Sequence, residues 1–379
     1  MEIGIVTFHC SYNFGSALQA WALKEYLESK GHNVHVIDYR SEDFVQYRLL
    51  RFRGVKSFVS DFVFLPRNMR RRRSFHAFWN EHFNMTNRTY KGLNALHDLA
   101  RDADKFDAVI AGSDQIWNLD CTCGPNPIFF LAFVPERCLK IAYAPSLAHK
   151  SFNPAYFTAD DKKRIAVWLN RFNAISVREL AVAGQFEQLT TRPFTETLDP
   201  TLLLNLSEYR NIEATRLPCG LKAGNFLFAY TLWPDEAMNA YVDRIAEKQN
   251  LTIAYYSKKQ VHYKSKSVNC YGMGPSEFLA MIDKASSVVS NSFHATVFSI
   301  LFSKPFLTFS TDRSTSRIST LLNNLGLSTE HLIRAHNDST TILPFASYLD
   351  SHKMERLRRQ SEHFLSDALK MSVQKHVCE

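Results

Sequence analysis

The chain of 379 residues lacks several patterns that would assign it to a functional class directly. No uninterrupted apolar run is long enough to span a bilayer, and the strand-like start after Glu2 does not resemble a signal peptide. We therefore expect a cytoplasmic protein. Gly-x-Gly-x-x-Gly, internal repeats and low-complexity tracts are also missing, which argues against the common dinucleotide-binding turn and against repeat architectures.

Cysteine is scarce and scattered, with seven residues in the whole chain. Cys121 and Cys123 form the only close pair in the sequence, and no second pair stands at metal-site spacing. We expect reduced thiols and no bound metal. Hydrophobic residues make up 45% of the chain, which is enough for a sizeable core and for about two domains.

Positive charge predominates, with a formal net charge of +8. Much of the excess is local, at Arg48, Arg51, Arg53, Arg67 and Arg70–Arg73. Such a cluster is compatible with a solvated helix face, an anionic membrane surface, an acidic glycan or nucleic acid. No nucleic-acid module accompanies it, so we expect no nucleic-acid partner, and we expect the arginines at 67–73 to be exposed.

Strand-like and helix-like segments alternate along the chain, which predicts an α/β fold. We expect one domain over 1–204 with an arginine-rich helical insertion at about 41–100, a linker at 205–225, a second domain over 226–345 and a helical tail over 346–379. The expected strands cover 3–7, 34–37, 108–111, 140–144, 174–177, 194–198, 226–232, 251–256, 268–271, a run ending at 288–289, and 306–309.

Polar loops follow the first two inner strands, where doubly wound domains bind ligands. Asn13, Gly15 and Ser16 lie in the turn after the first strand, although Gly15 is also explained by tight turn geometry alone. Ser113 and Asp114 follow the strand at 108–111, with Trp117 close behind. This second loop suits contact with a sugar or phosphate, and it equally suits an Asx-type turn.

Arg178 stands at the end of the strand at 174–177. A guanidinium in this position can hold a phosphate or carboxylate through two hydrogen bonds. The alternative is an ion pair with Glu179 or Glu187.

The stretch 288–301 has the clearest functional pattern. A short β-branched run leads into Ser290, Asn291 and Ser292, and an apolar segment of helical length begins close to His294. This predicts a histidine at the start of a helix, where free N–H groups and the helix dipole favour an anion. A histidine satisfied by local hydrogen bonds is the simpler alternative.

Five stretches together resemble the polysaccharide pyruvyl transferase family, in the family's order and over roughly residues 1–330. They are Asn13-Phe14-Gly15-Ser16-Ala17-Leu18-Gln19-Ala20, Gly112-Ser113-Asp114-Gln115-Ile116-Trp117-Asn118, Ser176-Val177-Arg178-Glu179, Leu198-Asp199-Pro200-Thr201-Leu202-Leu203 and Ser290-Asn291-Ser292-Phe293-His294-Ala295-Thr296. The resemblance implies two Rossmann-like domains facing across a cleft, as in GT-B enzymes. It implies that the site residues meet in that cleft. From the sequence itself we expect the helical tail to pack back across the domains.

The resemblance also implies an activity. Members transfer an enolpyruvyl group from phosphoenolpyruvate to a sugar of a surface polysaccharide, form a pyruvate ketal and release phosphate. The implied partners are phosphoenolpyruvate and an oligosaccharide or lipid-linked glycan, with peripheral contact to the inner membrane face as a further hypothesis. The chemistry requires no metal and no cofactor besides the donor.

The resemblance also implies functional roles for residues of this chain that match the family's motifs. His294 matches the histidine implicated in donor binding and acid catalysis, and Arg178 matches an arginine that contacts the donor. Well-studied branches have Arg-Leu-His where this chain has Ser292-Phe293-His294, so the missing guanidinium must be replaced. The next loop offers Arg313 and Arg317, beside Asn291 and Ser292 as further donor contacts.

Two other functions share these features. A glycosyltransferase of the GT-B type would use a nucleotide sugar in the same architecture. A catalytically silent glycan-binding relative would keep the fold without the chemistry. Phosphate released from phosphoenolpyruvate in the presence of an acceptor would distinguish the pyruvyl transferase from both.

Overall fold

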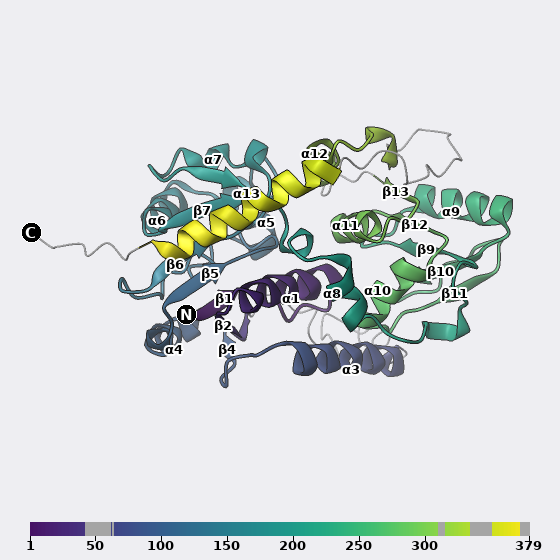
Figure 1. Ribbon diagram of the computed structural model, residues 1–379, viewed down its shortest axis with the longest axis horizontal. Coiled ribbons are helices and arrows are strands. Elements are labelled where there is room, and N and C mark those ends of the chain that lie inside the picture. Colours follow the sequence, from purple (N-terminus) through teal and green to yellow (C-terminus); the bar gives the residue numbers. More distant parts are fainter. Residues whose placement is uncertain (42–61, 63, 310–314, 334–350, 372–379) are drawn as a thin grey trace, which may run out of the picture. The chain divides into compact units, whose positions relative to one another are not determined.

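The computed structural model describes residues 1–41, 62, 64–309, 315–333 and 351–371. The chain divides into two compact units (Figure 1). The N-terminal unit comprises Met1–Tyr47, Trp79–Leu203 and Glu355–Glu379, and the C-terminal unit comprises Arg48–Phe78 and Leu204–Met354. Each unit contains one six-stranded parallel sheet, which confirms the predicted α/β class with two Rossmann-like units.

The N-terminal sheet has the strand order β2-β1-β5-β6-β7-β8. Its strands are β1 (Glu2–Val6), β2 (Asn33–Val36), β5 (Ala108–Ala111), β6 (Leu139–Ala142), β7 (Ala174–Val177) and β8 (Phe194–Glu196). All residues of β5 and β6 are buried, as expected for central strands covered on both faces. The direction of winding reverses between β1 and β5, so the loops after these strands lie at a topological switch point.

Helices and a small sheet complete the N-terminal unit. The helices are α1 (Phe14–Ser29), α4 (Leu96–Asp102), α5 (Leu119–Thr122), α6 (Ala159–Asn170) and α7 (Gly184–Glu187), with short 3-10 turns η2 (Leu93–Ala95), η3 (Ala103–Lys105), η4 (Pro154–Tyr156), η5 (Leu180–Val182) and η6 (Pro200–Leu202). β3 (Tyr39–Arg40) and β4 (Tyr90–Lys91) pair in parallel. Helix α1 is buried along almost its whole length because both its apolar and its small polar side chains face neighbouring segments.

The C-terminal sheet has the order β11-β10-β9-β12-β13-β14, which is the 3-2-1-4-5-6 order of dinucleotide-binding folds. Its strands are β9 (Phe226–Tyr230), β10 (Thr252–Tyr256), β11 (Ser267–Asn269), β12 (Ser287–Ser290), β13 (Phe306–Phe309) and β14 (Leu332–Ile333). Its helices and turns are α8 (Leu206–Ile212), η7 (Pro218–Gly220), α9 (Glu236–Gln249), α10 (Pro275–Lys284), α11 (Phe293–Leu301), α12 (Thr315–Leu325) and η8 (Thr329–His331). The switch point here lies between β9 and β12.

The C-terminal helix α13 (Ser351–Lys370) packs back onto the N-terminal unit, as the sequence predicted (Figure 1). Ser361 Oγ accepts a hydrogen bond from the backbone N–H of Leu198 at 2.9 Å. Arg358 Nε donates to the backbone oxygen of Leu202 at 2.8 Å. Both contacts join α13 to the segment that follows β8.

The segment expected as a linker at 205–225 contains a helix. A capping box between Asn205 and Glu208 starts α8, and Tyr209 is fully buried with its ring 5.1 Å from that of Phe298. The segment therefore belongs to the C-terminal unit. Polar composition and the absence of a clear hydrophobic period suggested a linker. The short helix α8 is instead stabilised by the packing of its buried Tyr209, since tertiary packing supplies most of the stability of helices in proteins.

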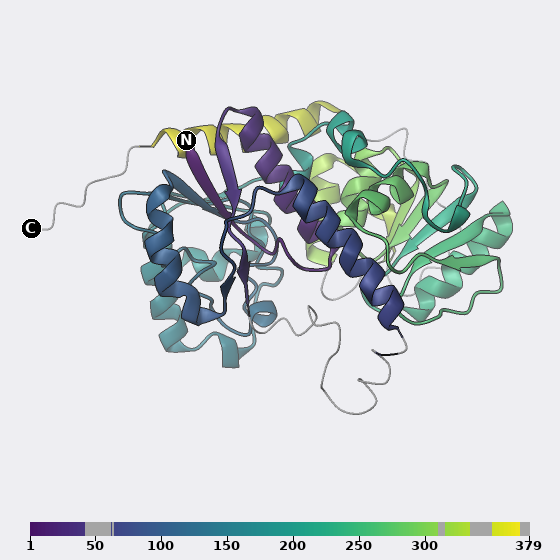
Figure 2. The ribbon, with the colours of Figure 1, turned by 90° about the horizontal axis from the view of Figure 1, so that it is seen from below.

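The arginine cluster lies on α3 (Leu65–His82), a single continuous helix (Figure 2). Arg67, Arg70, Arg72 and Arg73 are exposed as expected, but Arg71 is not. Its guanidinium carbon lies 5.5 Å from the ring centre of Tyr271, 6.0 Å from that of Tyr256 and 5.8 Å from that of Phe75. The sequence-based expectation is therefore wrong for this residue.

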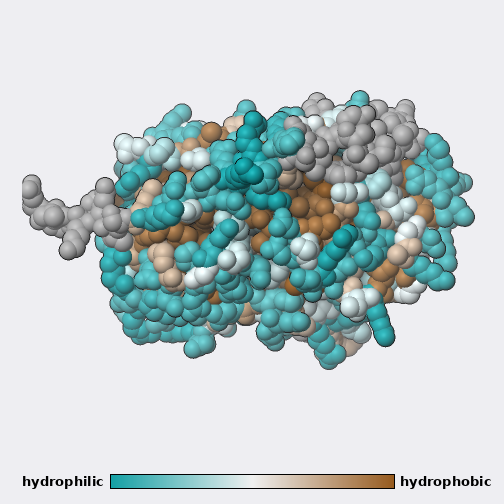
Figure 3. All heavy atoms as spheres, in the orientation of Figure 1, coloured by the Kyte–Doolittle hydropathy of each residue, from teal (hydrophilic) through white to brown (hydrophobic). Residues whose placement is uncertain are grey.

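The division between units also falls within α3, so its residues up to Phe78 belong to the C-terminal unit, whereas the sequence suggested an insertion in the first domain. Arg48, Arg51 and Arg53 lie outside the described residues. Contact of the exposed arginines with a membrane stays a prediction. Within the described part of the chain, no helix is long and apolar enough to cross a membrane. The face shown in Figure 3 is mostly hydrophilic.

Replacing Arg71 with alanine is expected to reduce the free energy of unfolding by about 1–3 kcal/mol, because it removes desolvated cation–π contacts and buried methylene groups. Arg73→Ala on the same helix is the matched control and should change the value by about 0.5 kcal/mol or less. Urea unfolding measures both. Equal effects of the two substitutions would show that the packing of Arg71 against these aromatic rings does not stabilise the fold.

Candidate functional site

The switch point of the N-terminal unit is organised by side chains from the loops after β1 and β5. Asn13 caps α1, and its Oδ1 accepts hydrogen bonds from the backbone N–H groups of Gly15 at 2.9 Å and Ser16 at 3.3 Å. Ser16 Oγ donates to Asp114 Oδ2 at 2.5 Å. Five of the six predicted cleft residues in this unit therefore lie in one continuous polar cluster, since Ser113 directly precedes Asp114.

Sequence reasoning missed two members of this cluster as individual site residues. Gln19 Nε2 donates to Thr7 Oγ1 at 2.9 Å, and Gln19 Oε1 accepts from the backbone N–H of Ser113 at 3.1 Å. Thr7 Oγ1 in turn donates to the backbone oxygen of Ser113 at 2.9 Å. A buried glutamine on the inner face of α1 was the available signal, since such a side chain needs specific partners.

Gly112 explains how this loop leaves β5. Its φ is +129°, and a Cβ at this position would stand 2.0 Å from the backbone oxygen of Tyr143. Only glycine fits such a close approach. The polar residues that follow are thereby held against the end of the neighbouring strand β6.

Arg178 lies deep in the N-terminal unit and pairs with a different carboxylate from the two that the sequence suggested. One of its terminal nitrogens lies 2.8 Å from Asp199 Oδ2 and donates to Ser113 Oγ at 2.6 Å. The side chains of Arg178 and Asp199 are only 3% and 0% exposed. Asp199 Oδ1 also accepts from Thr201 Oγ1 at 2.6 Å. This geometry gives Arg178 a positioning role, and its predicted contact with the donor stays a prediction.

Trp117 does not lie at a ligand-binding surface. Its side chain is fully buried, its ring stacks on Phe130 at 5.2 Å, and its Nε1 donates to the backbone oxygen of Phe129 at 3.1 Å. The predicted cleft contact is therefore corrected to a role in the hydrophobic core. The position of Trp117 in a polar loop suggested an exposed ring, but a large aromatic side chain gains more by packing in the interior.

At the switch point of the C-terminal unit, Asn291 connects the loops that follow β9 and β12. Its Oδ1 accepts a hydrogen bond from the backbone N–H of Leu232 at 2.8 Å, and its Nδ2 donates to the backbone oxygen of Trp233 at 3.1 Å. Both ends of the amide thus hold the loop after β9 against the loop after β12. Asn291 therefore has a structural role, and its predicted contact with the donor stays a prediction.

His294 is the second residue of α11, as the sequence predicted, and it is 8% exposed. Ser292 caps the helix, with its Oγ accepting from the backbone N–H of Ala295 at 3.4 Å. The ring of Phe293 lies edge-on to that of His294 at 5.2 Å, and the guanidinium of Arg317 lies 5.9 Å from the Phe293 ring centre. Arg317 therefore stands near the first turn of α11, whereas Arg313 lies outside the described residues.

The predicted meeting of the residues of the two switch points in one site stays a prediction. In each unit the polar side chains gather at the carboxyl ends of parallel strands. At α11 the helix start adds its positive dipole to the cation of Arg317, which suits a phosphate or carboxylate.

Among the residues that the structure describes, His9, Cys10 and Asp38 bring one ligand atom each within 4.8 Å of one another. Asp38 also accepts hydrogen bonds from Arg40 at 2.8 Å and 2.9 Å and from Thr89 at 2.6 Å. Burial alone would raise the pKa of Asp38, but the hydrogen bonds from His9, Arg40 and Thr89 hold it well below its usual range. Because a guanidinium already balances this carboxylate, we assign no metal to the group.

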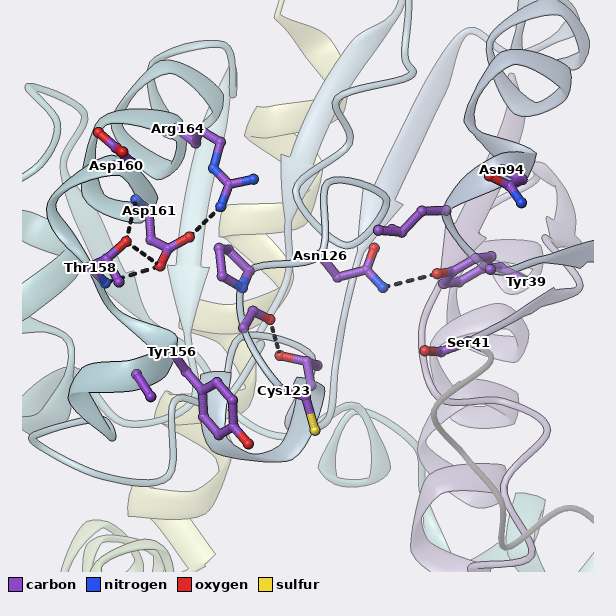
Figure 4. Close-up of a pocket in the computed structure, with 16 residues that line it drawn as sticks. Tyr39, Ser41, Asn94, Cys123, Asn126, Tyr156, Thr158, Asp160, Asp161 and Arg164 are labelled. Atoms are coloured by element: carbon purple, nitrogen blue, oxygen red, sulfur yellow. Dashed lines mark hydrogen bonds and ion pairs between the residues drawn. The ribbon is translucent and has the colours of Figure 1, made fainter.

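A pocket of about 620 Å³ lies within the N-terminal unit (Figure 4). Figure 4 shows Tyr156, Asp160 and Arg164 on one side of the opening and Tyr39 and Asn94 on the other. None of the site residues predicted from sequence lines it. The lining comes from the small β3–β4 sheet, the loop after α5 and the start of α6, so no single stretch of sequence indicated it.

Solved structures similar to the chain include Methanocaldococcus jannaschii UDP-GlcNAc 2-epimerase, with 11% identity and a TM-score of 0.48 over 99% of this chain and 94% of that one. Arabidopsis thaliana UGT89C1 complexed with UDP-L-rhamnose is similar at 10% identity and a TM-score of 0.49, over 97% of this chain and 98% of that one. No curated protein matches the chain.

The family comparison agrees with the motifs in the loops described above. The model of the polysaccharide pyruvyl transferases matches residues 13–313. This match begins at the Asn13 cap, runs through both switch points and covers most of the chain. The protein is therefore a member of the polysaccharide pyruvyl transferase family.

Proposed function

We propose that the chain transfers an enolpyruvyl group from phosphoenolpyruvate to a sugar of a surface polysaccharide. The product is a pyruvate ketal, and phosphate is released. The observation that carries the proposal is the position of His294 in the first turn of α11, at the switch point of the C-terminal sheet. Family membership supports a transferase of this kind.

The chemistry assigns His294 the role of proton donor. A histidine side chain ordinarily titrates near neutrality and suits general acid catalysis. In the proposed step, His294 protonates the methylene carbon of the donor, and a sugar hydroxyl attacks the adjacent carbon. Phosphate then leaves, and a second hydroxyl closes the ketal. The two hydroxyl protons lost by the sugar balance the proton taken by carbon and the one that leaves with phosphate.

We propose Arg317 as the cation that replaces the arginine missing at Ser292. Its guanidinium lies near Phe293, the direct neighbour of His294, and the positive end of the helix dipole at the start of α11 adds to the anion-binding character. Arg178 is less suited to first contact with the donor because its guanidinium is buried against Asp199.

We also propose that the pocket of Figure 4 holds sugar units of the acceptor. Its volume of about 620 Å³ lies within the usual range for small-molecule sites. Carboxylate, amide and hydroxyl groups around the opening match the hydrogen-bonding groups of a sugar, and the ring of Tyr156 offers a face for stacking.

Tyr156→Ala is therefore expected to raise the KM for the acceptor about 2- to 13-fold, since one aromatic contact is worth roughly 0.5–1.5 kcal/mol. The KM for phosphoenolpyruvate should stay unchanged. Val167→Ala, on the exposed face of α6 and outside the pocket, is the control. An unchanged acceptor KM in Tyr156→Ala, measured by initial rates, would remove the pocket from the acceptor path.

The proposed function itself is tested with purified protein, phosphoenolpyruvate and a panel of oligosaccharides. We expect acceptor-dependent phosphate release together with a product that carries a pyruvate ketal, detected by mass spectrometry. Turnover of a nucleotide sugar in place of phosphoenolpyruvate would support the glycosyltransferase alternative. Glycan binding without turnover of either donor would support the silent relative.

A further inference from the structure

Two cysteine side chains of the C-terminal unit meet although they are 51 positions apart in the chain. Cys219 lies in the turn η7 and is exposed, whereas Cys270 follows β11 and is 2% exposed. The Cys270 thiol donates to the backbone oxygen of Val268 at 4.0 Å. Cys219 Sγ also lies 3.7 Å from the backbone oxygen of Asn269, the residue directly before Cys270. An accessible sulfur is therefore held beside a buried one.

Arginines of α3 lie next to this pair. A Cβ added at Gly272, two residues after Cys270, would stand 3.3 Å from Arg70 Cδ and 3.5 Å from the backbone oxygen of Arg67. The hydrogen bond from Cys270, followed by the positive charges of Arg70 and Arg67, lowers the pKa of Cys219 to about 6. The hydrogen bond to Cys219 and burial raise the pKa of Cys270 above its usual range.

This arrangement divides the two roles that disulfide formation requires. The lowered pKa of the exposed Cys219 favours its thiolate, which is the nucleophilic form of the side chain. The buried Cys270 remains a thiol within reach and can resolve an oxidised partner. The guanidinium groups of Arg70 and Arg67 stabilise the thiolate form of Cys219.

We propose that Cys219 and Cys270 form a peroxide-sensitive thiol pair that oxidises reversibly to a disulfide. The Cys219 thiolate attacks hydrogen peroxide, an S–O bond forms, the O–O bond breaks, and the released hydroxide takes up a proton as water. The sulfur of Cys270 then attacks the sulfenic acid at Cys219. An S–S bond forms, the S–O bond breaks, and the thiol proton leaves with the hydroxide as a second water. Two thiols are oxidised and one peroxide is reduced.

Oxidation has a local electrostatic consequence. It removes the negative charge that faces Arg67 and Arg70, so the attraction between this turn and α3 weakens. We expect faster amide hydrogen exchange in the first half of α3 after oxidation. The inference does not depend on the transfer reaction, so it can succeed or fail independently of the proposed function.

The test uses the full chain at pH 7, treated with a small excess of hydrogen peroxide, alkylated and analysed by peptide mass spectrometry. We expect a peptide linked through Cys219 and Cys270 that reducing agent separates again. Alkylation of Cys219 by iodoacetamide should be about 10-fold faster than that of the exposed Cys123, because rate follows the thiolate fraction. It should have a pH midpoint near 6.

Substitutions separate the roles. Cys270→Ser should leave Cys219 reactive and trap it as a sulfenic acid, whereas Cys219→Ser should prevent the linked peptide. Arg70→Gln should slow alkylation of Cys219, and Arg72→Gln on the same helix should not. Equal alkylation rates at Cys219 and Cys123, or peroxide treatment that yields no linked peptide in the wild-type chain, would overturn the proposal.

Discussion

Replacing His294 with glutamine is expected to lower the rate of the chemical step by about 10²- to 10⁴-fold, the usual contribution of a general acid. Glutamine keeps a hydrogen-bond donor at the second position of α11 but has no proton of suitable acidity to give to carbon. His294→Ala should be impaired to a similar extent. The positive dipole of the helix start remains in both variants, so phosphoenolpyruvate should still bind.

Single-turnover rates and donor dissociation constants, measured on the same preparations, check this division. His262→Gln, an exposed histidine elsewhere in the C-terminal unit, is the control and should keep the wild-type rate. If His294→Gln reacts as fast as the wild type, the histidine positions other groups and the proton comes from another side chain. If donor affinity falls while the rate is preserved, His294 is a binding residue.

Replacing Arg178 with alanine is expected to reduce the free energy of unfolding by about 3–5 kcal/mol, because it leaves the carboxylate of Asp199 buried without its cation. Asp199 is fully buried and cannot recover the lost interaction from water. The same substitution also removes a hydrogen bond to Ser113, in the loop after β5. Loss of activity should therefore accompany loss of structure in the N-terminal unit.

Denaturant unfolding of Arg178→Ala and Arg101→Ala provides the comparison. Arg101 forms exposed ion pairs with Asp98 and Asp102, and its removal should cost no more than about 1 kcal/mol. Replacing Arg178 and Asp199 together with methionine and leucine should recover much of the lost stability. A stable Arg178→Ala variant with weakened binding of phosphoenolpyruvate would instead support the donor contact implied by the family resemblance.

The order and type of most elements could be predicted from the sequence. Short apolar, β-branched runs predicted nearly all strands of both sheets, and the expected ranges 108–111, 174–177 and 306–309 agree with β5, β7 and β13. Capping chemistry is also local, which is why the roles of Asn13 and Ser292 at helix starts follow from their neighbours alone. His294 at a helix start was predicted for the same reason.

The partners of the polar side chains were decided by the tertiary structure. Nothing near Arg178 in the sequence indicates Asp199, and Asn291 holds a loop that begins about sixty residues earlier. Arg71 resembles its exposed neighbours in every local property and differs only because aromatic rings from β10 and the turn after β11 surround it.

Local sequence determined where strands and helices begin and end, because backbone hydrogen bonding, hydrophobic periodicity and capping act between residues a few positions apart. Only the tertiary structure decided which polar groups became buried, since a buried charge or amide must be matched by a group from whichever segment the fold brings beside it. The same reason explains the different positions of Trp117 and Tyr156. Trp117 lies in the core, where neighbouring strands and helices pack against it. Tyr156 lines a pocket that three segments, distant in sequence, enclose.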